Sequence, residues 1–302
     1  MNYLQPYLDY LKFERGLSAL TIENYQRDIL QMLALANLQE DQSKLNSITA
    51  SHIRLFIGKL HSQKLSGKSL ARMLSAWRGF FAYLIKHHRF ENNPCQAIKP
   101  PKSPKTLPHA LAPDQAHQLL NIKEDDDISL RDRAILELFY SSGLRLAELI
   151  SVKLEDIDGH NGTITVTGKG NKTRIVPVGS FALDAIRAWL KARVKIATEN
   201  THLFINPKGK PLSARTIQHR MKYWAIKQGL SSNLHPHLLR HSFATHVLQS
   251  SGDLRAVQEM LGHANISTTQ VYTHLDFQHL AKIYDQAHPR ACLLYTSPSP
   301  RD

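Results

Sequence analysis

The sequence predicts a mainly helical protein of two domains, with a small β-hairpin in the second domain. Apolar residues recur at helical spacing through most of residues 1–98. A segment rich in proline and lysine follows, and a helical pattern resumes at residue 113. The clear β signal lies in residues 163–178, where β-branched residues flank a glycine-rich turn. A chain of 302 residues is long enough to form two hydrophobic cores.

The first domain, over residues 1–98, is expected to be a helical bundle. Ser18 and Thr49 are suited to cap its second and third helices, because their hydroxyls can accept a hydrogen bond from a free backbone N–H. The segment from Ser69 to His88 has the strongest apolar stripe, which we interpret as core packing. The first helix is indicated by apolar residues at three-and-four spacing: Tyr3, Leu4, Tyr7, Leu8 and Leu11.

A basic, proline-rich linker is expected over residues 99–112. Its prolines remove backbone donors and disfavour helix in the residues before them, so the segment should be extended. Pro113 and Asp114 then open a new helix, and the second domain is expected over residues 113–291. Strands at 163–167 and 173–178 would place Lys169 at their turn. Further helices are expected at 182–194, 213–228, 243–249 and 254–261.

Composition limits the class of protein and of partner. The formal net charge of +13 suggests binding to a polyphosphate through counterion release, although solvated surface lysines are an equally good account. No apolar run approaches the ~20 residues that span a bilayer, and the first residues lack the pattern of a signal peptide. Two cysteines, Cys95 and Cys292, offer neither a disulfide framework nor a metal site. We expect a cytoplasmic protein.

The last residues, 292–302, do not continue any periodic pattern. They resemble the translation of an adapter sequence used in sequencing libraries, so we expect a non-native tail. A natural disordered tail is the alternative interpretation.

The densest cluster of chemically active side chains runs from His235 to His241. On a helix that starts near Pro236, His237 and Arg240 are three residues apart and share a face. An imidazole beside a guanidinium suits an anionic phosphate, because arginine presents a planar fork to two oxygens. Ordinary surface histidines are the alternative. A metal site is disfavoured, because no Cys, Asp or Glu stands at ligand spacing within the cluster.

Two more segments add candidate residues. Arg145 lies among leucines, and it either pairs with Glu148 three residues later or binds a phosphate. Gly262 is suited to end a helix just before His263, and Ser267 to cap a helix that carries Tyr272. A lone tyrosine most often packs its ring, but a nearby imidazole favours a nucleophile, since a phenol with a pKa of about 10 needs help to react.

Taken together, these residues resemble the motif of the tyrosine recombinases, the phage integrase family. The resemblance extends from Tyr3 to the His-Pro-Arg at 288–290, and the run from His235 to Leu280 is most similar to the Xer subgroup. Six residues occur in the family's order and spacing: Arg145, Lys169, His237, Arg240, His263 and Tyr272.

The resemblance implies a role for each of the six. Tyr272 would attack the scissile phosphate and form a 3′-phosphotyrosyl bond. Arg145 and Arg240 would hold the non-bridging oxygens of that phosphate, and His263 would donate a further hydrogen bond. Lys169 would protonate the leaving 5′-oxygen, while His237 would assist proton transfer. Neither a metal nor another cofactor is implied.

The family also implies a fold and partners. A helical, SAM-like core-binding domain and a catalytic domain would form a C-shaped clamp around a double-stranded DNA recombination site. The partner would be a XerD-type recombinase in a heterotetramer, activated by a septal DNA translocase, with no membrane involved. The apolar stripe after the nucleophile would dock into a neighbouring protomer, or alternatively pack on its own domain: Phe277, Leu280, Ile283 and Tyr284.

Charged residues outside the motif are expected to contact DNA phosphates. The candidates are Arg72, Lys172, Arg174, Arg215 and Arg220. The function expected by resemblance is the resolution of chromosome or plasmid dimers through a Holliday junction. Three alternatives stay open: an integrase of a mobile element, a non-catalytic DNA-binding protein of the same fold, and a metal-dependent nuclease.

Overall fold

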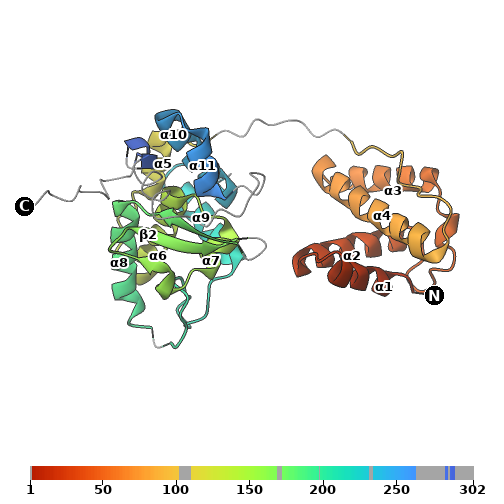
Figure 1. The fold of residues 1–302 in the computed structure, drawn as a ribbon, viewed down its shortest axis with the longest axis horizontal. Coiled ribbons are helices and arrows are strands. Elements are labelled where there is room, and N and C mark those ends of the chain that lie inside the picture. The colour runs from red at the N-terminus through yellow and green to blue at the C-terminus, as the bar shows by residue number, and fades with distance from the viewer. Residues whose placement is uncertain are drawn as a thin grey trace, which may run out of the picture. The chain divides into compact units, whose positions relative to one another are not determined.

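The computed structural model describes residues 2–101, 110–168, 172–196, 198–230, 234–262, 283–284 and 286–289. The chain divides into two compact units, residues 1–107 and 108–302, which we call the N-terminal and C-terminal units (Figure 1). Both are mainly helical, and the C-terminal unit contains a small sheet, as the sequence predicted; the sheet has three strands. No helix in the described ranges is long and apolar enough to cross a membrane.

Helices make up the N-terminal unit. The predicted caps are confirmed, since Ser18 accepts from the Thr21 N–H and Thr49 from the His52 N–H. The first helix differs from expectation because it passes into a π-helical turn. The elements are α1 (Leu4–Asp9), η1 (Tyr10–Glu14), α2 (Ala19–Leu35), η2 (Leu45–Ser47), α3 (Ala50–Ser62) and α4 (Gly67–His88).

The stripe of α4 forms the core of this unit, as predicted. Trp77 and Phe80 are fully buried, and the indole N–H of Trp77 donates to the backbone carbonyl of Asp28 at 2.7 Å. The buried Asp28 carboxylate pairs with Arg72, which joins α2 to α4. Arg72 is therefore partly engaged within the unit.

The first helix of the C-terminal unit is the predicted one, with Pro113 in its first turn. Buried on nearly all sides, α6 packs along α8 (Figure 1). The helices are α5 (Pro113–Leu120), α6 (Asp127–Ser142), α7 (Leu146–Ser151), η3 (Leu154–Asp156), α8 (Ser180–Arg193), α9 (Ala214–Lys227), α10 (Pro236–Ser251) and α11 (Leu254–Leu261).

The sheet contains the predicted hairpin. Strand β2 (Thr163–Thr167) pairs antiparallel with β3 (Thr173–Pro177), with Thr167 opposite Thr173. The Gly168 N–H donates to the Lys172 carbonyl at 2.8 Å and closes the neck of the hairpin. A third strand, β1 (Ile157–Asp158), pairs with β2 and was not predicted, because two residues are too few to show an alternating pattern.

The described residues near the C-terminus pack on their own unit. Tyr284 and Ala287 are buried in a cluster that includes Phe243 and Val257. The Tyr284 hydroxyl lies 2.8 Å from the hydroxyl of Ser141. Ile283 and Tyr284 thus pack on their own domain, which was the alternative interpretation of the apolar stripe. Phe277 and Leu280 lie outside the described residues.

Candidate active site

Arg145 stands at the start of α7, immediately after the turn that ends α6. Its backbone N–H donates to Glu148 Oε2 at 2.8 Å, and its Nη1 donates to Glu148 Oε1 at 2.8 Å. Its Nη2 reaches the Gly262 carbonyl at 3.1 Å. The local ion pair that the spacing suggested is present, yet the guanidinium is also partly exposed and directed at the end of α11.

Arg240 lies on α10, the predicted helix of the histidine cluster. His235 caps that helix, since its Nδ1 accepts from the Leu238 N–H at 3.1 Å. Arg240 Nη1 donates to the Gly143 carbonyl at 2.5 Å, and Nη2 donates to the Leu261 carbonyl at 2.7 Å. His237, in the first turn of α10, is exposed and shares a face with Arg240 by helical spacing.

Gly143 permits this approach between α6 and α10. It ends α6 with φ +56°, a left-handed conformation that favours glycine. A Cβ at this position would lie 2.4 Å from the Phe243 ring on α10. Glycine therefore brings the carbonyl that Arg240 binds close to α10.

Three arginines converge on the C-terminal end of α11. The last carbonyls of a helix lack intrahelical partners and carry the negative end of its dipole, so they attract cations. Each of three successive carbonyls accepts from a different arginine: Met260 from Arg174, Leu261 from Arg240 and Gly262 from Arg145. Gly262 ends the helix with φ +64°, as predicted, and leads directly into His263.

The Glu148 carboxylate holds two of these arginines. Arg174 Nη1 and Nη2 donate to Oε1 and Oε2 at 2.7 and 2.9 Å. Burial by itself raises the pKa of Glu148, but hydrogen bonds from Arg174 and from the Arg145 backbone N–H outweigh burial and lower that pKa to about 2. Burial and the charge of Arg145 lower the pKa of Arg240 to about 10, so Arg240 stays protonated at neutral pH. The site is therefore strongly positive.

The titration of Glu148 is expected to make stability depend on acid pH. Because its folded pKa of about 2 lies below the ordinary 4.5, its contribution is complete above pH 4.5 and is lost as the pH falls toward 2. Between pH 7 and pH 3 the loss is about 2 kcal/mol. Urea unfolding should show the free-energy gap between wild type and Glu148→Gln narrowing by this amount, because glutamine does not titrate. A free-energy difference between the two proteins that does not change with pH would contradict the lowered pKa of Glu148.

Half of the six predicted active-site residues fall within the described residues. Arg145 and Arg240 are brought together at the end of α11, and His237 lies on the same helix as Arg240. Lys169, His263 and Tyr272 lie outside the described residues.

The predicted phosphate contacts separate into two groups. Lys172 and Arg215 are exposed, whereas Arg72 pairs with Asp28. Arg220 pairs with Asp132, and its guanidinium carbon lies 4.4 Å from the centre of the Tyr223 ring.

The expectation that Arg174 contacts phosphate does not fit the structure. Its side chain is only 6% exposed and is held by Glu148 and Met260. The sequence contained a signal for this, since Arg174 alternates with the exposed Thr173 and Ile175 and therefore shares the inner face of β3 with Val176. The spacing in the sequence indicates Glu148 only as a local partner of Arg145, because Arg174 is 26 positions away.

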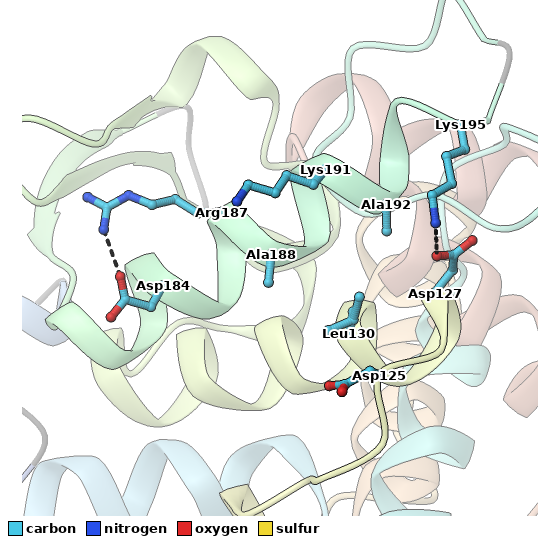
Figure 2. A pocket seen from close by; sticks show the side chains of 9 residues that line it. All are labelled: Asp125, Asp127, Leu130, Asp184, Arg187, Ala188, Lys191, Ala192 and Lys195. Carbon is cyan, nitrogen blue, oxygen red and sulfur yellow. Dashed lines mark hydrogen bonds and ion pairs between the residues drawn. The ribbon is translucent and has the colours of Figure 1, made fainter.

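A surface pocket lies elsewhere in the C-terminal unit, between α8 and the start of α6 (Figure 2). Two ion pairs line this pocket, Arg187 with Asp184 at 2.7 Å and Lys195 with Asp127 at 2.9 Å. None of the predicted active-site residues lines it. It is therefore distinct from the arginine cluster.

Sequence comparison matches both halves of the chain. The profile described as the phage integrase family matches residues 109–279, and that of the phage integrase N-terminal SAM-like domain matches residues 4–88. A relative named tyrosine recombinase XerC from Pseudomonas aeruginosa is 51% identical, covering 95% of each chain. Another of that name from Xanthomonas campestris pv. campestris is 49% identical, covering 96% of this chain and 89% of the relative.

Solved structures show the same fold. XerH site-specific recombinase, bound to palindromic difH substrate in a post-cleavage complex, matches with a TM-score of 0.68 and 28% identity, covering 89% of this chain and 80% of the other. A lambda integrase dimer bound to a COC′ core site matches with a TM-score of 0.68 and 20% identity, covering 89% and 97%. The similarity to lambda integrase, at 20% identity, shows a shared fold alone.

Proposed function

Because this chain belongs to the phage integrase family of tyrosine recombinases, it is an enzyme that cleaves and rejoins DNA, and we propose that Arg145 and Arg240 form its phosphate-binding centre. The observation that carries this proposal is their convergence at the C-terminal end of α11, directly before His263. Both guanidinium groups are held by backbone carbonyls, so their charge is in place before DNA arrives.

The proposed reaction is a pair of transesterifications. The phenol oxygen of Tyr272 attacks the scissile phosphorus, and a 3′-phosphotyrosyl bond forms as the bond to the 5′-oxygen breaks. Lys169 gives a proton to that oxygen, and His237 assists removal of the phenol proton. The 5′-hydroxyl of a partner strand then attacks the phosphotyrosine and releases Tyr272.

The reaction requires that the negative charge developing on the phosphate oxygens in the transition state be stabilised. In the proposal, Arg145 and Arg240 bind the two non-bridging oxygens, and His263 donates a further hydrogen bond. Side chains then supply the positive charge, so we propose a reaction that needs no metal. No ATP is required, because the phosphotyrosyl bond conserves the energy of the phosphodiester.

The biological task that we propose is resolution of chromosome or plasmid dimers in the cytoplasm. It would proceed through a Holliday junction in a heterotetramer with a XerD-type recombinase, activated by a septal DNA translocase. The name of the similar XerC relatives supports this assignment. Lys172 and Arg215, both exposed, remain our candidates for phosphate contacts, with Arg72 and Arg220 as partly engaged ones.

The experiment that tests the function traps the covalent intermediate. A labelled duplex carrying a candidate dimer-resolution site is nicked, so that the cleaved end diffuses away and religation stops. The full chain and a XerD-type partner whose own nucleophile has been removed are incubated with it in excess chelator. A labelled adduct of this chain's mass on a denaturing gel is the expected result.

Two other results would count against the proposal. An adduct that appears only when Mg²⁺ is restored would contradict the metal-independent reaction. Cleaved DNA without any adduct would contradict a covalent mechanism and favour a nuclease. The duplex with a scrambled site serves as the control, because phosphate contacts alone cannot select a sequence.

A further inference from the structure

Arg174 has no role in the reaction described so far, yet its guanidinium binds the same carboxylate as Arg145 and the same end of α11 as Arg145 and Arg240. It comes from β3, the strand that follows Lys169 in the sequence. Its Nε donates to the Met260 carbonyl at 3.1 Å, and its two terminal nitrogens donate to Glu148. With its side chain buried, it is not available to a DNA phosphate.

We propose that Arg174 is a positioning residue, which fixes the Glu148 carboxylate that holds Arg145 and packs against the backbone at Gly168 and Gly262, without touching the substrate. This inference rests on the proposed function of Arg145. It concerns the alignment of the Arg145 guanidinium, which the pairing of Arg145 with Glu148 does not by itself determine.

The first link runs through Glu148 to Arg145. Each carboxylate oxygen accepts two hydrogen bonds: Oε1 from Nη1 of Arg174 and of Arg145, and Oε2 from Arg174 Nη2 and the Arg145 backbone N–H. A carboxylate bound from both sides cannot rotate freely. Without Arg174 it would keep only its contacts to Arg145, and the Arg145 guanidinium would lose a fixed anchor.

The second link is to the backbone next to two active-site residues. A Cβ at Gly262 would lie 3.1 Å from both Cδ and Nε of Arg174, so the arginine packs directly against the residue before His263. A Cβ at Gly168 would lie 3.3 Å from Glu148 Oε1 and 3.7 Å from Arg174 Nη1. Gly168 precedes Lys169. The ion pair therefore lies against the backbone at Gly168 and Gly262, the residues that precede Lys169 and His263 in the sequence.

Lysine cannot reproduce this arrangement. Arg174 uses three nitrogens of a rigid planar fork in fixed directions, toward Met260 and toward both oxygens of Glu148. A lysine ammonium is a single point charge on a flexible stem. Arg174→Lys thus keeps the charge and removes the geometry.

The test measures cleavage and binding separately with the full chain on the nicked duplex. Wild type, Arg174→Lys and Arg174→Gln are compared at saturating protein in single-turnover reactions with the partner described above. We expect the rate constant for adduct formation to fall at least tenfold in the lysine variant and about a hundredfold in the glutamine variant, because small misplacement of reacting groups has effects of that size. The Kd for the duplex should change less than about threefold, since Arg174 makes no phosphate contact.

Arg187→Gln is the matched control. Arg187 is 58% exposed, pairs with an aspartate three residues away and lies at the pocket outside the site. We expect wild-type rate and affinity from it.

A double-mutant cycle of Arg174→Gln with Glu148→Gln tests the link between these two residues. Their effects on the rate constant should be strongly non-additive, because each change alone already breaks the Arg174–Glu148 ion pair.

The outcomes separate the possibilities. A lower final yield of adduct at an unchanged rate constant would mean that Arg174 only keeps the protein folded, and would overturn the inference. A tenfold weaker Kd at an unchanged rate constant would mean that Arg174 contacts a DNA phosphate. That result would also overturn the inference. Absence of adduct with the wild type would instead overturn the proposed function.

Discussion

Phenylalanine at position 272 is expected to abolish the covalent protein–DNA adduct while leaving DNA binding intact. The phenol oxygen is the atom that bonds to phosphorus, and the substitution removes that oxygen while keeping the ring. The adduct is measured on a denaturing gel, and binding by mobility shift on the same duplex.

Tyr10→Phe provides the control for Tyr272→Phe. Tyr10 lies in the π-helical turn of the N-terminal unit and packs against the Tyr83 ring, with 5.1 Å between ring centres. It should give wild-type amounts of adduct. If Tyr272→Phe still yields an adduct of this chain's mass, another residue is the nucleophile. An adduct of the partner's mass would show that the partner preparation retained activity.

The substitution Arg240→Ala is expected to lower the rate constant for cleavage by about a thousandfold. Loss of one preorganised donor to a developing negative charge typically costs a factor of 10² to 10³, and Arg240 supplies two donors and a full charge. The change also leaves the carbonyls of Gly143 and Leu261 without their partner. Leaving buried acceptors unpaired should reduce the free energy of unfolding by about 1–3 kcal/mol as well.

The two effects of Arg240→Ala are separable by measurement. Single-turnover cleavage gives the rate constant of the molecules that fold, and urea unfolding gives the stability. Arg255→Ala is the matched control, since Arg255 lies on α11 but is 73% exposed and pairs with Glu259 at 3.0 Å. Its rate should be that of wild type. A wild-type rate in Arg240→Ala would remove Arg240 from the phosphate-binding centre.

Features decided by local chemistry were predictable from the sequence. Ser18 and Thr49 cap helices because a hydroxyl satisfies free N–H groups within the same turn. Gly262 ends α11 because glycine adopts a left-handed conformation at little cost. The hairpin follows from alternation within one segment. The spacing of six residues was also sufficient to indicate the family.

The tertiary structure alone decided which side chains hold the site together. Arg174 and Met260 are 86 positions apart, and Arg240 and Gly143 are 97 apart, so no local pattern relates them. Alternation placed Arg174 on the inner face of β3, but only the packing of α7 and α11 against that face supplies Glu148 and the Met260 carbonyl as partners. The physical reason is that a buried charge requires partners in three dimensions, whereas a capped turn finds them within a few residues.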